Sequence, residues 1–104
     1  MLYTQSELYA VITPILRNFP VKRVAIFGSY ARNEQGHSSD VDLLLDLDVN
    51  DSYPTVDYVF DMLALIEDKT KLRIDYMTVR ALQSSPSTKL KQAIERDCRW
   101  FYEV

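Results

Sequence analysis

Cysteine, histidine and glycine are scarce in this chain, which has one cysteine, one histidine and two glycines among its 104 residues. The single cysteine, Cys98, excludes an intrachain disulfide, and we expect it to be a small buried apolar side chain. The single histidine, His37, lies in a polar stretch, where an exposed position is expected. Catalytic sets that pair histidine with serine or cysteine are therefore hard to build, and no Cys/His cluster supports zinc.

Long apolar runs are also missing, so no segment approaches the length of a membrane span. The N-terminal stretch has no basic region ahead of an apolar run and does not resemble a signal peptide. We therefore expect a cytoplasmic protein with no membrane partner. The length and the 47% hydrophobic content suit one globular domain, which we place at residues 1–104.

Positive charge is absent from the middle of the chain. Residues 33–68 contain no lysine or arginine but ten acids, whereas residues 69–104 contain eight bases and four acids. Most of these charges are expected on solvated faces. The net charge of −3 argues against direct binding of nucleic acid. The acidic middle favours a site for a metal or a basic partner.

Hydrophobic periodicity predicts alternating helices and strands. Thr4 and Glu7 fit a capping box at the start of the first helix, which Pro14 is expected to kink or split. The expected helices span 4–18, 29–33, 54–68 and 87–102, and the expected strands span 21–27, 40–47 and 72–79. This order indicates an α+β fold, an α/β two-layer arrangement with a small mixed sheet of about three strands. The aromatic run 100–102 is expected to cap the core or to form an exposed partner surface.

Two local patterns in the sequence suit the binding of a phosphate and of a metal ion. Gly28 and Ser29 directly follow a strand, where a glycine permits close backbone approach and unpaired N–H groups attract a phosphate. By itself such a pair is usually a structural cap. Asp40 and Asp42 are two residues apart on a strand, so both carboxylates project from one face. An isolated pair of this kind is usually solvent-exposed, but the strand is apolar enough to favour a bound Mg²⁺.

A third acid, Asp75, stands alone in the apolar strand LRIDYMTV. An acid in such a strand needs a partner, and Arg73 on the same face offers a simple surface pair. The alternative is a third metal ligand, since two-metal transfer of a phosphoryl-type group uses carboxylates that bridge the ions and one that activates the attacking hydroxyl.

Together the segment FGSYARNEQGHSSDVDLLLD and the downstream acid resemble the polymerase-beta-like nucleotidyltransferase superfamily, and the short length resembles its minimal nucleotidyltransferase (MNT) branch. The resemblance implies that Gly28 and Ser29 hold the triphosphate of ATP, with Arg32 and Ser39 nearby. It also implies that three aspartates bind metal, two Mg²⁺ ions being expected, and act in catalysis: Asp40, Asp42 and Asp75. Asn33 stands where family members often have glycine, and asparagine tolerates the left-handed conformation of a helix end.

The resemblance further implies a partner. MNT proteins are often paired with a helical HEPN-domain toxin, as the antitoxin of a toxin–antitoxin system, and transfer AMP to a tyrosine of the toxin. A small domain also leaves its site open, so a homo- or hetero-oligomer is expected. Two alternatives stay open: a non-catalytic module that neutralises its partner by occlusion, and a weaker one, transfer to a small acceptor such as an aminoglycoside.

Overall fold

A computed structural model describes residues 3–47 and 57–104. Its elements, in chain order, are α1 (Gln5–Leu16), β1 (Val21–Phe27), β2 (Val41–Leu47), α2 (Asp57–Thr70), β3 (Ile74–Thr78), α3 (Val79–Ser84), α4 (Thr88–Asp97) and β4 (Arg99–Glu103). The expected start of the second long helix at Pro54 lies outside the described residues. None of the helices in the described ranges is both long and apolar enough to cross a membrane.

The sheet is mixed, as predicted, but within the described residues it has four strands in the order β3-β2-β1-β4. Strand β1 pairs antiparallel with both β2 and β4, and β2 pairs parallel with β3. The prediction of about three strands is therefore wrong by one. Among the described residues β3 and β4 form the two edges, and β2, which carries Asp42 and directly follows Asp40, lies in the interior of the sheet.

The missing strand lies where the sequence predicted helix to residue 102. Helix α4 ends at Asp97, and Cys98 adopts an extended conformation with φ −65° and ψ 144°. The following segment is rich in aromatic residues, which favour a strand, and it pairs with β1. Within it Phe101 stacks on Tyr9 of α1 with ring centroids 4.6 Å apart, whereas Trp100 is partly exposed beneath the Arg23 guanidinium, 4.1 Å from its ring centroid. The aromatic run therefore caps the core on one side, as expected, and leaves Trp100 partly exposed on the other, whereas its use as a partner surface stays a prediction.

The short helix predicted at 29–33 is also absent. These residues form hydrogen-bonded turns instead, and Asn33 has a left-handed φ of 58°. The tolerance expected of asparagine at this position is confirmed. A short helix that the periodicity did not predict, α3, follows β3 directly, because the Thr78 hydroxyl accepts the Ala81 N–H at 3.0 Å and caps its first turn.

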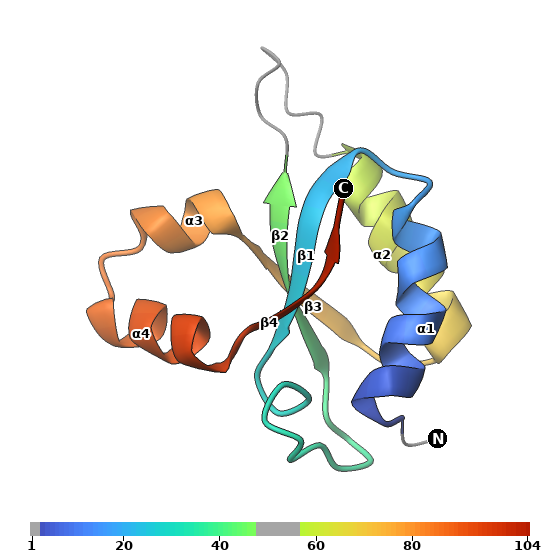
Figure 1. The fold of residues 1–104 in the computed structure, drawn as a ribbon, viewed down its shortest axis with the longest axis horizontal. Coiled ribbons are helices and arrows are strands. Elements are labelled where there is room, and N and C mark those ends of the chain that lie inside the picture. The colour runs from blue at the N-terminus through green and yellow to red at the C-terminus, as the bar shows by residue number, and fades with distance from the viewer. Residues whose placement is uncertain (1–2, 48–56) are drawn as a thin grey trace.

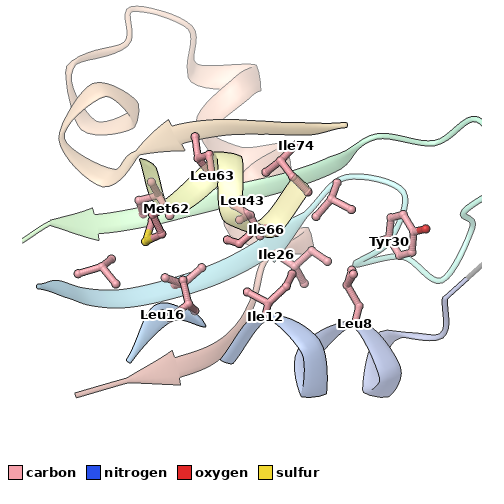
Figure 2. Packing of buried hydrophobic residues seen from close by; sticks show 14 of the residues in the cluster. Leu8, Ile12, Leu16, Ile26, Tyr30, Leu43, Met62, Leu63, Ile66 and Ile74 are labelled. Atoms are coloured by element: carbon pink, nitrogen blue, oxygen red, sulfur yellow. The ribbon is translucent and has the colours of Figure 1, made fainter. Parts of the chain in front are cut away.

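Helices cover both faces of the sheet, with α1 and α2 on one side and α3 and α4 on the other (Figure 1). The predicted two-layer arrangement is corrected in this respect. Figure 2 shows the larger core, where α1 and α2 pack on the sheet. Its labelled side chains are Leu8, Ile12, Leu16, Ile26, Tyr30, Leu43, Met62, Leu63, Ile66 and Ile74. A smaller cluster of Ala25, Leu44, Leu82 and Ile94 lies under α3 and α4, and partly buried Cys98 packs against it.

The first helix begins with the predicted capping box. The Thr4 hydroxyl accepts the Glu7 N–H at 3.1 Å, and the Glu7 carboxylate accepts the Thr4 N–H at 2.9 Å. Pro14 lies inside α1, two residues before the helix ends at Leu16, so the helix is not split at the proline. Leu8, Ile12 and Leu16, at spacings of four, are fully buried and fix this helix on the sheet.

Candidate active site

The predicted phosphate-binding residues lie on the turn that leaves β1, at the end of the sheet where β2 begins. Gly28 has φ +75°, in the left-handed region that favours glycine. A Cβ at this position would overlap the Asp42 Oδ2 atom and lie 3.2 Å from its Cγ. The left-handed φ and this overlap both favour glycine at position 28, where the backbone of the turn approaches the carboxylate of Asp42.

The turn is closed by main-chain hydrogen bonds and held to the first helix. The Arg32 N–H donates to the Gly28 carbonyl at 3.1 Å and the Glu34 N–H donates to the Ser29 carbonyl at 2.8 Å. The Gln5 side-chain amide of α1 donates to the carbonyls of Tyr30 and Ala31. Because Tyr30 is also anchored in the larger core, the loop is fixed from the side away from the acids.

The three predicted acids are brought together by the sheet. Asp42 and Asp75 are direct register partners in the parallel pairing of β2 with β3. Asp40 lies immediately before β2 and two residues from Asp42, so a β-like alternation places it on the same side. This side is the one that carries Leu44 towards α3 and α4. Asp40 and Asp42 are half-buried, whereas Asp75 is exposed.

Electrostatics agree with this placement. Burial raises the pKa of Asp42, the negative charges of Asp75 and Asp40 raise it further, and the Arg32 guanidinium opposes them. Carboxylates that repel one another at the end of a strand offer the hard oxygen donors that Mg²⁺ takes, so the donor set fits the ion. Within residues 3–47 and 57–104, however, no three acidic, histidine or cysteine side chains are gathered closely enough to form a ready-made metal centre. The assignment of Asp40, Asp42 and Asp75 as metal ligands stays a prediction.

The two predicted serines have different surroundings. Ser29 is half-buried on the turn beside Gly28. The Ser39 hydroxyl accepts the Gly36 N–H at 2.9 Å, and the Ser39 N–H donates to the Gly36 carbonyl at 3.2 Å. Ser39 thus closes the loop that leads into Asp40, which is a structural use of its hydroxyl. Triphosphate binding by either serine stays a prediction, and exposed His37 lies in the same loop.

Arg32 forms an ion pair with Asp97, an acid that the sequence did not single out. Its guanidinium pairs with Asp97 at 3.2 Å and with Glu34 at 3.4 Å. Asp97 also pairs with Arg96 at 3.1 Å, and the two arginines lower the pKa of its carboxyl. Asp97 is the last residue of α4, and a carboxylate at a helix C-terminus is disfavoured by the helix dipole. Because the sequence predicted this helix to continue to residue 102, no local signal in the sequence pointed to Asp97.

The fold and these residues define a class of protein. A mixed sheet whose glycine turn lies against one acid of an Asp-x-Asp pair, with a third acid in register on the next strand, is the arrangement expected of a nucleotidyltransferase. Residues 9–101 match the family described as "Nucleotidyltransferase domain", and the chain belongs to this family. The resemblance stated from the sequence is thereby confirmed.

Relatives in archaea match most of the chain. One from Methanocaldococcus jannaschii, whose name marks it provisionally as a protein adenylyltransferase, is 33% identical over 98 residues, covering 90% of this chain and 94% of the relative. The "Protein adenylyltransferase MntA" of Thermococcus cleftensis is 27% identical over 96 residues, covering 88% of this chain and 94% of that protein.

Solved structures share the fold. A toxin–antitoxin complex with AMP-PNP has a chain with a TM-score of 0.67 at 19% identity, covering 92% of this chain and 73% of the other. A second is described as a tri-AMPylated Shewanella oneidensis HEPN toxin in complex with MNT antitoxin, with a TM-score of 0.62 at 18% identity, covering 96% of this chain and 73% of the other. These similarities confirm the nucleotidyltransferase fold.

Proposed function

We propose that this protein is an antitoxin that transfers AMP from ATP to a hydroxyl group of a HEPN-type toxin, with tyrosine as the acceptor and Mg²⁺ as the required ion. One observation carries the proposal: the register that sets Asp75 opposite Asp42, on the side of the sheet reached by the Gly28 turn. The names of the relatives and the partners of the structural neighbours support the choice of AMP and of a protein acceptor.

Each residue has a defined task in this proposal. The turn at Gly28 and Ser29 offers backbone N–H groups to the triphosphate, and Arg32 adds positive charge beside it. Asp40, Asp42 and Asp75 would hold Mg²⁺, which neutralises the charge that develops on the phosphates and leaving pyrophosphate. Asp75, the exposed member of the three, is reachable by an acceptor hydroxyl and takes its proton as the oxygen attacks the α-phosphorus.

The negative charge of this protein favours a basic protein as the acceptor. With a net charge of −3 and ten acids without a base in residues 33–68, the protein repels a nucleic-acid backbone and attracts a basic protein surface. A partner that covers the open site also excludes water from it, so transfer is expected to need both proteins.

Intact mass spectrometry of the two purified proteins with ATP and Mg²⁺ tests the proposal. We expect the partner to gain one or more AMP units, a gain that Asp40→Asn abolishes while the fold is retained. Asp68→Asn is the matched control, because this carboxylate is highly exposed and pairs only weakly with Lys71 at 3.4 Å. Full transfer by the Asp40 variant would refute the site.

Occlusion of the partner is the second candidate function, and the open site and acidic surface are compatible with it. It predicts inhibition of the partner with no change in mass and no dependence on Asp40. Efficient tailing of free RNA by this protein alone would contradict both candidates and would assign a nucleic-acid acceptor.

A further inference from the structure

A groove lies between α2 and the edge strand β3, beside the proposed catalytic acids. Its volume is about 390 Å³, and its lining includes Phe60 and Glu67 from α2 and Asp75 and Tyr76 from β3. Phe60 is 60% exposed and Tyr76 is 39% exposed, although both have large, mainly apolar aromatic side chains. The two rings stand edge to face with centroids 6.4 Å apart.

The base of the groove is rigid. Leu63 and Ile74, which line it, are almost fully buried and belong to the larger core. The Glu67 Oε1 atom accepts the Ile74 N–H at 3.2 Å and so ties the helix to the start of the strand. Phe60 and Tyr76 are therefore exposed rings on a fixed framework, an arrangement that lowers the entropic cost of binding a partner.

The described lining of the groove contains acidic residues but no basic ones. Glu67 is acidic, Asp75 lies at the rim of the groove on the edge strand, and no lysine or arginine is among the described residues that line the groove. Aromatic rings also attract cations at their faces. An occupant that combines an apolar or aromatic side chain with a neighbouring lysine or arginine matches this lining, whereas an acidic segment does not.

The groove is continuous with the proposed active site. Ile74 and Tyr76 face α2, so by strand alternation the Asp75 side chain points to the opposite face, where it meets Asp42. Strand β3 is the edge of the sheet among the described residues. A chain segment seated in the groove therefore has to cross only this one strand, about 5 Å wide, to reach the carboxylates.

From this placement we infer that the groove docks the acceptor segment of the partner protein, which is basic and presents its hydroxyl over the edge of β3 to Asp75. This inference rests on the proposed function, because it assigns the partner surface of the same site. Phe60 and Tyr76 act as the anchors and Glu67 as the charge that selects a basic segment.

Phe60→Ala tests the docking surface, with Leu65→Ala as the matched control. Leu65 is 50% exposed on the same helix but does not line the groove. Calorimetry with the purified HEPN-type partner should show at least about a tenfold loss of affinity for the Phe60 variant and little change for the control. The KM for the partner should rise while ATP binding and the rate at saturating partner stay the same.

Charge is tested separately by Glu67→Gln, which keeps a carbonyl oxygen to accept the Ile74 N–H. This variant should weaken partner binding at low salt, and the difference from the wild type should disappear at high salt. An unchanged salt dependence would contradict the selection of a basic segment.

The outcomes separate this inference from the proposed function. If the wild type transfers no AMP but the Phe60 variant alone loses partner binding, the groove is confirmed and the proposed function fails. If transfer is observed and Phe60→Ala binds the partner as tightly as Leu65→Ala does, the function stands and the groove assignment is wrong. A wild-type dimer in sedimentation that Phe60→Ala dissociates, with partner affinity unchanged, would assign the groove to a second copy and overturn the inference.

Discussion

Replacing Gly28 by alanine perturbs the proposed site through two separate physical effects. The backbone at this position has φ +75°, which an alanine adopts only at a cost. The added Cβ also overlaps the Asp42 Oδ2 atom, so the carboxylate or the turn has to move. Asp42 lies on an interior strand between two register partners, Phe27 and Asp75, and its backbone has little freedom to give way.

The two effects can be estimated from the structure. The left-handed conformation costs a non-glycine residue about 1–2 kcal/mol, and forcing an extra methyl group into a packed site costs about 1–3 kcal/mol. The lower entropy of the unfolded alanine chain offsets about 0.4–1 kcal/mol. Together these ranges give a loss of about 1–5 kcal/mol for Gly28→Ala, centred near 3, and each kcal/mol lowers the Tm by about 4–8 °C in a domain of this size.

Urea denaturation of the wild type and four variants measures these effects separately. Gly36→Ala is the matched control, since its φ is not left-handed and its added methyl group would meet no atom within 4 Å apart from those of the residue itself and its chain neighbours. This variant should be neutral or slightly stabilising. In an Asp42→Ala background the overlap is gone, and the cost of Gly28→Ala should fall by at least about 1 kcal/mol. Equal stability of the two glycine variants, or no coupling with Asp42, would refute the reasoning.

Three further predictions concern the same end of the sheet. In the presence of chelator, the raised pKa of Asp42 means that the folded protein holds a proton that the unfolded chain releases. The stability that protonated Asp42 contributes is therefore lost as pH rises above 3.8 and through the folded-state pKa. Asp42→Asn should melt higher than the wild type at neutral pH, and the Tm difference should shrink on acidification. Asn33→Gly should raise stability by up to about 1 kcal/mol in thermal melts because φ is 58°. Asp97→Asn should raise the KM for ATP several-fold with a smaller change in kcat, because it releases Arg32, whereas Arg96→Gln should leave the KM unchanged; equal effects of the two variants would contradict the role of Asp97.

Local signals in the sequence predicted most of the elements. The β-branched run before Gly28 predicted β1 with its observed bounds, and the Thr4 and Glu7 pair predicted the first cap. The prediction failed after Asp97, where Phe101 continues a helical spacing although its ring stacks on Tyr9 from a strand. That contact joins residues far apart in the chain, and a helical period cannot reveal it.

The candidate site likewise contains residues that local signals in the sequence predicted and one that they did not. Gly28, Asp40 and Asp42 could be proposed because each is explained by its immediate neighbours: a strand end, a turn and a two-residue period. Asp97 could not be proposed from its neighbours, because the cation that compensates its position at a helix C-terminus is Arg32, 65 positions away in the sequence. The helix dipole disfavours a carboxylate at that C-terminus, and the structure supplies the cation that compensates for it.

The position of Asp75 shows why a parallel pairing determines the whole site. Strands β2 and β3 are joined through α2, so nothing local fixes which residue of β3 meets Asp42. A shift of one residue would place Ile74 or Tyr76 opposite Asp42 and would turn Asp75 towards α2. Burial of Ile74 against the larger core and the Glu67 bond to its N–H oppose that shift. The same contacts that form the base of the groove therefore also keep Asp75 in register with Asp42.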